Sequence, residues 1–295
     1  MMKITKLAAI DIGSNAVRLL VSAIYEEEGR VTFNKTSLVR VPIRLGEDAF
    51  VRGEISEENE KRLIQAMTAY KLLMDVHQVQ GYCAFATSAM REVKNGKEIV
   101  QKIREKAGVN LEIIDGQKEG QIIFETELKE YINNKNAYLY IDVGGGSTEL
   151  TILAHGKMLN TRSFNIGTVR WLNGKVDSSY LTREVKPWVM ENCKNLGNIE
   201  MIGSGGNINH IFKYSGKKKS LSFTYLNQQR KILSALDFED RLSIYNMKPD
   251  RGDVIIPALE IYTSVMKFAK AKKMYVPKIG LADGMVQYMY HHKKY

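Results

Sequence analysis

Two short loops with glycines each follow an apolar run that ends in an aspartate. The first is Ile10-Asp11-Ile12-Gly13-Ser14-Asn15, and the pattern returns as Ile141-Asp142-Val143-Gly144-Gly145-Gly146. Glycine admits the positive φ and the close backbone approach that an anion-binding nest requires. An aspartate at the end of the preceding strand is placed to hold a metal ion beside that anion. The repeat therefore predicts two loops that hold one phosphate chain and its metal ion.

The residues after each loop decide what kind of loop it is. Ala16 to Ile24 and Ser147 to Leu153 continue as apolar, β-branched runs typical of strands. Each loop is therefore predicted to be a hairpin tip, whereas a Walker or dinucleotide-binding loop would open a helix. The Walker pattern would also need Gly-Lys-Ser/Thr. For either loop alone, an alternative stays open: a tight turn in which the glycines only allow the backbone to turn and bind no phosphate.

Size and composition indicate a soluble α/β protein of two domains. The chain has 295 residues, of which 44% are hydrophobic, enough for two ordinary cores. The N-terminal residues lead into a strand that Asp11 soon interrupts, and no apolar window is long enough to span a bilayer. We therefore expect a cytoplasmic location and no membrane partner. Cys83 and Cys193 have no metal-ligand or disulfide spacing and are expected to be reduced.

The formal net charge of +10 and a pI of about 9.3 point to an acidic partner. Part of the excess comes from clustered lysines: Lys217, Lys218, Lys219, Lys267, Lys270, Lys272, Lys273, Lys293 and Lys294. A solvated basic face is one interpretation, and steering of a polyanionic substrate is the other. Nucleic acid is a weaker third partner, because aromatic residues are not regularly interleaved with the lysines.

Strands and helices are predicted to follow one another twice. In the first half we expect a strand over 40–45, a helix over 56–76, a strand over 81–87, a helix over 97–107, a strand over 111–114 and a helix over 117–131. The helix over 56–76 has apolar residues at helical spacing, and Ser56 is its expected N-cap. The polar stretch Ile132-Asn133-Asn134-Lys135-Asn136 resembles a hinge. The predicted domains are therefore residues 1–132 and 133–295, each with one phosphate loop. The last helix could pack back on the first domain.

Several segments together resemble the exopolyphosphatase and guanosine-pentaphosphate phosphohydrolase (Ppx/GppA) family. Besides the two loops, the matching segments are Ala86-Thr87-Ser88-Ala89-Met90-Arg91, Gly203-Ser204-Gly205-Gly206, Lys248-Pro249-Asp250-Arg251-Gly252-Asp253 and Gly280-Leu281-Ala282-Asp283-Gly284. Their order and spacing are more specific than any one of them. The resemblance implies two ribonuclease-H-like lobes of the actin, sugar-kinase and heat-shock ATPase superfamily, with the active site in an interlobe cleft.

The resemblance is to the short, two-domain form of the family. Longer members carry a helical extension of HD-domain type, and this sequence contains no His-Asp dipeptide. A homodimer that extends the binding surface is a plausible consequence. Lys118 and Ala282 depart from the family's pattern, as does Gly120 where the family has alanine.

Phosphoryl transfer to water needs donors for the phosphoryl oxygens, a metal ion and a carboxylate that orients the water. We expect Mg²⁺ or Mn²⁺ at Asp142, with Asp11 as a weaker second ligand and Glu149 near the metal-bound water. Asp11 could instead only cap its own turn. The residues expected to bind phosphate are Gly13, Ser14, Asn15, Gly144, Gly145, Gly146, Ser147, Gly205 and Gly206.

Two glutamates and an arginine are the candidate catalytic residues. The resemblance assigns the base role to Glu119, which would otherwise be interpreted as a solvated residue at a helix start. Its neighbour Lys118 could lower its pKa and weaken it as a base. Glu149 could share the role, or be a polar residue on an exposed hairpin face. Arg91 could clamp a phosphoryl group or form a surface ion pair, and Arg18 could be the partner of a carboxylate.

These residues predict an exopolyphosphatase that releases orthophosphate from the end of inorganic polyphosphate. The runner-up is hydrolysis of the 5′-terminal phosphate of guanosine pentaphosphate (pppGpp) to the tetraphosphate (ppGpp). A kinase of the sugar-kinase type should instead bind ATP tightly. A regulator that binds polyphosphate or guanosine nucleotides without turnover also stays open, and actin-like assembly is the least favoured alternative.

Overall fold

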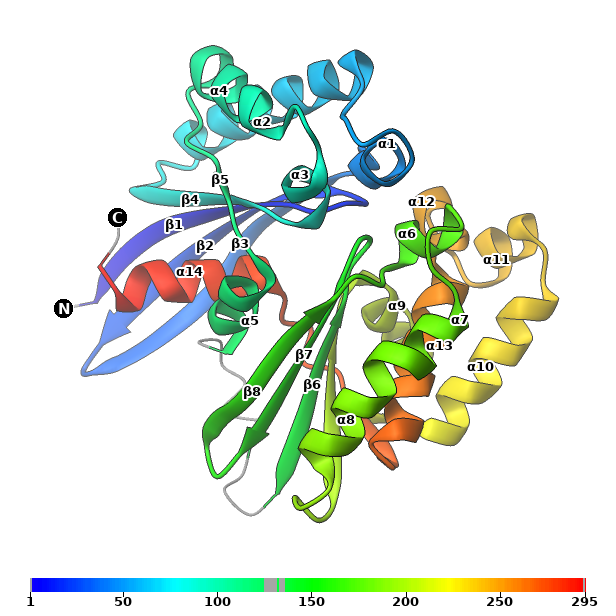
Figure 1. The fold of residues 1–295 in the computed structure, drawn as a ribbon. Coiled ribbons are helices and arrows are strands. Elements are labelled where there is room, and N and C mark those ends of the chain that lie inside the picture. Colours follow the sequence, from blue (N-terminus) through cyan, green and yellow to red (C-terminus); the bar gives the residue numbers. More distant parts are fainter. Residues whose placement is uncertain (1, 125–131, 133–135, 294) are drawn as a thin grey trace. The chain divides into compact units, whose positions relative to one another are not determined.

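The computed structural model describes residues 2–124, 132, 136–293 and 295. Two compact units divide the chain. Unit 1 comprises Met1–Thr126 with Leu281–Tyr295, and unit 2 comprises Glu127–Gly280 (Figure 1). The boundary predicted after residue 132 adjoins residues 133–135, which lie outside the described part of the chain, as does the end of the helix predicted over 117–131.

Unit 1 is built on a five-stranded sheet in the order β3-β2-β1-β4-β5. The antiparallel strands are β1 (Lys3–Ile12), β2 (Val17–Glu27) and β3 (Arg30–Val41), and β4 (Gly81–Ala86) and β5 (Glu112–Ile113) run parallel to β1. The first loop is the tip of the β1–β2 hairpin, as predicted. Residues 7–12 of β1 are all buried, which explains the unbroken apolar run Leu7-Ala8-Ala9-Ile10 before Asp11.

Helices cover both faces of this sheet. They are α1 (Leu45–Arg52), α2 (Glu57–Val76), α3 (Ser88–Glu92), α4 (Gly96–Ala107), α5 (Gly116–Phe124) and α14 (Leu281–His291). The side chain of Ser56 caps α2 by accepting from the Asn59 amide, as the sequence pattern predicts. The strand predicted over 40–45 is wrong beyond Val41, because Pro42 has no N–H for the ladder and Leu45 opens α1.

The last helix belongs to unit 1. In Figure 1, α14 lies on the face of the sheet opposite α2 and α4. It contacts β1, β2, β4 and α5. An ion pair of 2.8 Å between Lys35 Nζ on β3 and Asp283 Oδ1 holds its first turn. The C-terminal residues therefore support α5, the helix that carries Glu119.

Unit 2 repeats the same sheet order with one added strand. Its order is β10-β11-β9-β6-β7-β8, so β8-β7-β6-β9-β11 corresponds to β3-β2-β1-β4-β5. The strands are β6 (Ala137–Val143), β7 (Thr148–Ala154), β8 (Lys157–Phe164), β9 (Ile199–Ser204), β10 (Ser220–Ser222) and β11 (Lys273–Tyr275). The second loop is the tip of the β6–β7 hairpin. This shared order is the ribonuclease-H-like topology that the resemblance implies.

The helices of unit 2 pack around the buried helix α13 (Ile255–Phe268), which contacts β6, α6, α8, α9 and α10. The others are α6 (Thr168–Leu172), α7 (Ser178–Tyr180), the π-helical turn η2 (Leu181–Val185), α8 (Lys186–Cys193), α9 (Gly206–Tyr214), α10 (Phe223–Ala235), α11 (Phe238–Ile244) and α12 (Pro249–Gly252). Among the described residues, no helix is long and apolar enough to cross a membrane.

Candidate phosphate and metal site

The two glycine loops close with the same hydrogen bond. The amide of Gly13 donates to Ala16 O at 3.2 Å, and the amide of Gly144 donates to Ser147 O at 3.0 Å. Both glycine N–H groups are therefore committed to their turns, and the phosphate role predicted for them would require these bonds to break. The amides of Gly13 and Gly144 therefore stabilise the hairpin turns.

The carbonyl groups of the first loop show which way its amides point. Ser14 O and Asn15 O accept from the amides of Gly46 (2.8 Å) and Arg44 (3.0 Å), at the start of α1. In a trans peptide the C=O and the following N–H point in opposite directions. The amide of Asn15 therefore points away from α1, as a phosphate-binding role requires.

The second loop has the same arrangement. Gly144 O accepts from the amide of Thr168 (3.0 Å), and Gly145 O accepts from the amide of Val169 (2.8 Å), both in α6. Arg170 Nε donates to Gly146 O at 2.8 Å. With all three carbonyls directed at α6, the amides of Gly145, Gly146 and Ser147 point the other way. Three successive amides on one side could meet an anion. The positive φ predicted for the loop glycines is wrong, because none of Gly13, Gly144, Gly145 and Gly146 has one.

Hydrogen bonds join the first loop to the segment that carries Arg91. Ser14 Oγ and Ser88 Oγ are 2.9 Å apart, and the Thr87 amide donates to Ile12 O at 3.1 Å. Arg91 Nη1 donates to Ile114 O at 2.7 Å, just before α5. Arg91 thus ties the end of α3 to the loop before Glu119. The contact found is with a backbone carbonyl, and the clamp on a phosphoryl group stays a prediction.

Glu119 lies in the first turn of α5 and is 8% exposed. The interpretation as a solvated residue is therefore wrong. Asp115 starts this helix by accepting from the Lys118 amide at 2.8 Å. Lys118 Nζ lies 2.5 Å from Glu112 Oε1 on β5 and 4.9 Å from the centroid of the Phe85 ring. Its charge is thus paired with Glu112, which weakens its influence on Glu119.

A row of polar side chains crosses four strands of unit 2 beside the second loop. We call Ser204 (β9), Asp142 (β6), Glu149 (β7) and Ser163 (β8) the polar row; each is the strand partner of the next. Ser204 Oγ donates to Ile279 O at 2.8 Å and lies 3.4 Å from Asp142 Oδ2, and Ser163 Oγ donates to Glu149 Oε1 at 2.7 Å. Glu149 is only 2% exposed, so its interpretation as an exposed hairpin residue is wrong.

The equivalent positions in unit 1 carry opposite charges. Asp11 faces Arg18 across β1 and β2, and Arg18 Nη1 lies 2.6 Å from Asp11 Oδ2. Arg18 is therefore the partner of a carboxylate, as predicted. Asp11 has a cation of the protein beside it, whereas Asp142 faces a second carboxylate. The role of Asp11 as a metal ligand stays a prediction, and this ion pair makes it the less suited of the two aspartates.

The polar row fits a hard divalent cation. Two carboxylates directly opposite each other on adjacent strands repel, and a cation bound to both would remove that repulsion. The donors are all oxygens, which suits Mg²⁺ or Mn²⁺. Among the described residues there is no group of three or more His, Cys, Asp or Glu side chains that could hold a metal. Mg²⁺ needs no such group, because it commonly takes one or two carboxylates with water and phosphate oxygens.

Gly205 allows β9 and α9 to approach Asp142. Its φ is 120°, and a Cβ there would lie 2.8 Å from Tyr262 Oη and 3.3 Å from Asp142 Oδ1. The Tyr262 hydroxyl donates to Ser204 O. Burial, and then the charge of Asp142, raise the pKa of Tyr262 well above its usual value, so this group stays a donor. Close packing against Tyr262 and Asp142 explains why residue 205 is a glycine. The phosphate contacts predicted for Gly205 and Gly206 stay predictions.

Two arginines at this site were not among the predicted site residues. Arg170 contacts Gly146, as described above, and Arg251 Nη1 donates to Gly206 O at 3.0 Å. The signal for Arg251 was its place in a segment that resembles the family. The local sequence alone did not identify Arg170, because its approach to the second loop depends on hydrogen bonds between α6 and that loop.

The family model for Ppx/GppA phosphatases matches residues 24–293. The chain belongs to the Ppx/GppA phosphatase family. A solved exopolyphosphatase from Cytophaga hutchinsonii has 24% identity and a TM-score of 0.87, with 98% of each chain covered. A family member from Aquifex aeolicus has 22% identity and a TM-score of 0.79, with 99% of this chain and 100% of the other covered. These structures confirm the α/β fold with two mixed sheets.

The curated proteins that this chain resembles have different names. A bifunctional 3-dehydroquinate synthase/phosphatase from Fusobacterium nucleatum is 28% identical over 88% of this chain and 43% of its own length. Exopolyphosphatase 2 from Mycobacterium tuberculosis is 29% identical over 57% of this chain and 54% of its own. A guanosine-5'-triphosphate,3'-diphosphate pyrophosphatase from Photobacterium profundum is 24% identical over 96% of this chain and 59% of its own length. The chain thus spans about half the length of these Ppx/GppA relatives.

Proposed function

We propose that this protein is a metal-dependent exopolyphosphatase that releases orthophosphate from the end of inorganic polyphosphate. The observation that carries the proposal is the polar row beside the second loop. There, two opposed carboxylates suited to Mg²⁺ or Mn²⁺ adjoin three amides that point to one side. Membership of a phosphatase family agrees with this chemistry.

Each group has a role that its environment supports. Asp142 and Glu149 would hold the divalent ion, which lowers the charge repulsion of the phosphate chain when bound. Amides of Gly145, Gly146 and Ser147 would hold phosphoryl oxygens, with Asn15 in the same role in unit 1. Glu119 would accept the proton of the attacking water, while the rest of the phosphate chain leaves with the electron pair of the broken P–O bond.

Hydrolysis of pppGpp is the second candidate. It is favoured by the similarity to the Photobacterium profundum enzyme, which extends over 96% of this chain. The same carboxylates and loops would serve both reactions, so only relative rates separate them. The cytoplasmic location, the homodimer and the absence of nucleic acid and membrane partners also stay predictions.

The test is orthophosphate release with Mg²⁺ from tripolyphosphate, long polyphosphate, pppGpp and ATP in parallel. We expect polyphosphate to give the highest kcat/KM, and Glu119→Gln to lower kcat at least 100-fold while the protein still binds tripolyphosphate. Glu105→Gln, a substitution on the exposed face of α4, is the matched control. Faster release from pppGpp would select the second candidate. Binding without turnover of any of the four would instead indicate a regulator.

A further inference from the structure

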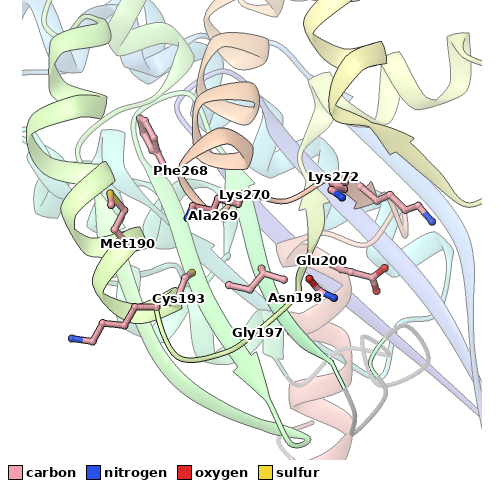
Figure 2. Close-up of a pocket in the computed structure, with 12 residues that line it drawn as sticks. Met190, Cys193, Gly197, Asn198, Glu200, Phe268, Ala269, Lys270 and Lys272 are labelled. Atoms are coloured by element: carbon pink, nitrogen blue, oxygen red, sulfur yellow. The ribbon is translucent and has the colours of Figure 1, made fainter.

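Unit 2 contains a cavity of about 560 Å³ that is separate from the polar row. It lies where β9 and β11 begin, and its described walls come from α8, the turn before β9, and the end of α13 (Figure 2). The polar row and the second loop lie at the other ends of β6 and β9, about 20 Å away for a six-residue strand. A volume between about 300 and 1,000 Å³ is typical of small-molecule sites.

One side of this cavity is apolar. Met190 and Cys193 line it from α8, Phe268 from α13 and Ile199 from β9. Figure 2 shows the first three as sticks around the cavity. Burial raises the pKa of the Cys193 thiol to about 11, so this group is neutral at physiological pH. Met190 is 49% exposed, so its flexible thioether side chain is accessible to a ligand in the cavity.

The cavity also has basic residues in its lining. Lys194, Lys270, Lys272 and Lys273 line it with one acidic residue, Glu200, and Lys194 Nζ is paired with Glu191 Oε1 at 2.6 Å. The Glu200 carboxylate accepts from Tyr275 Oη at 3.2 Å and from Asn136 Nδ2 at 3.3 Å. Favourable interaction with helix C-termini accounts for lysines at the ends of α8 and α13. It does not account for Lys272 and Lys273, which follow in extended chain and leave the cavity with an excess of positive charge.

Lys270 occupies a position where glycine is the usual residue. It follows the last turn of α13 with φ of 54°, in the left-handed region. The amide of Lys270 donates to Lys267 O, and the amide of Ala271 donates to Met266 O at 2.9 Å, which is the Schellman pattern. A side chain with a Cβ is strained there, and glycine would relieve the strain. Seven other non-glycine residues in the described part of the chain also have a positive φ, so this conformation does not by itself mark a binding site; it makes Lys270→Gly a substitution that should not destabilise the fold.

We infer that this cavity binds a small organic anion, in which a phosphate or sulfonate group is attached to an apolar ring. The lysines match the charge of the anionic group, and the surface made by Met190, Cys193, Ile199 and Phe268 would bury the ring. Inorganic polyphosphate has no apolar surface to place there, so it is not the expected occupant. The site is distinct from the one proposed for catalysis and does not depend on it.

The test uses anilinonaphthalene sulfonate as the probe, because it pairs an apolar ring system with a sulfonate and has no phosphoanhydride to hydrolyse. Titration followed by fluorescence and calorimetry should give one site per chain. Lys270→Gly should weaken binding at least five-fold while the melting temperature holds or rises by about 1–3 °C, since glycine suits the left-handed position. This separates loss of the site from loss of the fold.

Three further arms complete the test. Lys272→Glu should weaken binding at least ten-fold, and Lys218→Glu, in the other lysine cluster, should leave it unchanged. Met190→Glu should also weaken it, because it places a charge on the apolar side. Inorganic tripolyphosphate should not displace the probe. Equal binding by the wild-type protein, Lys270→Gly and Lys272→Glu, or displacement by tripolyphosphate at concentrations that saturate hydrolysis, would overturn the inference.

Discussion

Asp142 on β6 faces Glu149 on β7 as its antiparallel partner, directly before and after the second glycine loop. The pair that occupies the same place in unit 1 is Asp11 and Arg18, which form an ion pair. The same two strand positions therefore hold oppositely charged residues in unit 1 and two carboxylates in unit 2. Unit 1 pairs its strand-end aspartate with an arginine, and unit 2 places a second carboxylate opposite its strand-end aspartate, a pair of oxygen donors that suits a divalent cation.

The first prediction concerns Glu149→Gln. Removing one of two opposed carboxylates should raise the Mg²⁺ concentration for half-maximal phosphate release at least ten-fold and lower kcat about 100-fold. The melting temperature without metal should hold or rise, because the like-charge contact is gone. Phosphate release measured over a Mg²⁺ titration, with Glu184→Gln on the surface of unit 2 as control, checks this. An unchanged Mg²⁺ requirement would exclude Glu149 from the metal site.

The second prediction separates the two aspartates. Asp11→Asn breaks the ion pair with Arg18 and should destabilise the protein by about 1 kcal/mol, because the Arg18 guanidinium, whose side chain is 34% exposed, loses its partner but can still be partly solvated. It should leave the Mg²⁺ concentration for half-maximal activity within about two-fold. Urea unfolding and the same Mg²⁺ titration measure both quantities. If Asp11→Asn instead shifts the Mg²⁺ requirement as far as Glu149→Gln does, Asp11 is a metal ligand as well.

Local sequence patterns were sufficient for much of the fold. The Ser56 cap and the apolar spacing after it predicted α2, and the apolar runs around the two loops predicted both hairpins. The strand predicted over 40–45 was wrong beyond Val41 because Pro42 carries no N–H for the ladder. The place of α14 on the sheet of unit 1 depends on contacts between residues far apart in the chain, which no local pattern encodes.

The site was predictable where a strand end or a family segment marked it. The polar row needed strand register: Ser163 and Ser204 lie beside Glu149 and Asp142 only because β8 and β9 pair as they do. The burial of Glu119 was also not predictable from the local sequence, since a glutamate in a first helical turn is usually solvated. Hydrogen bonds between distant segments determine which loop amides point away from α1 and α6. The sequence therefore did not show that the amides of Gly13 and Gly144 close their turns while their neighbours point outward.

The third prediction concerns the contact between α14 and α5. A Cβ at Gly284 would lie 2.5 Å from Ile122 O, so Gly284→Ala must push α5 away. Ile122 is three residues after Glu119 on the same helix. We expect kcat to fall at least ten-fold with KM within about three-fold, because Glu119 is displaced while the residues expected to bind phosphate are untouched.

A matched substitution controls for a general effect of alanine at this end of the chain. A Cβ at Gly280 would meet nothing closer than Ser204 Oγ at 4.0 Å, so Gly280→Ala should change kcat less than two-fold. Steady-state kinetics on tripolyphosphate for both variants measures the difference. Equal kcat for Gly284→Ala and the wild type would show that α14 does not position Glu119.

The last prediction is a pH dependence that arises at Asp48. This buried carboxylate accepts from the Ser56 amide (2.9 Å), the Ser56 hydroxyl (2.6 Å) and Asn59 Nδ2 (2.8 Å), and so joins α1 to the start of α2. Burial alone would raise its pKa, but these hydrogen bonds together with the charge of Arg52 outweigh it and lower the pKa below the ordinary value of 3.8.

A carboxyl whose pKa is lower in the folded than in the unfolded state stabilises the fold above its unfolded pKa. That stabilisation is lost as the pH falls through the folded pKa. Asp48→Asn should therefore destabilise the protein by about 1–3 kcal/mol at pH 7, and the difference from wild type should shrink by about pH 3. Urea unfolding at both pH values measures it, with the exposed Asp75→Asn as control. A difference that is the same at both pH values would show that the charge of Asp48 does not contribute.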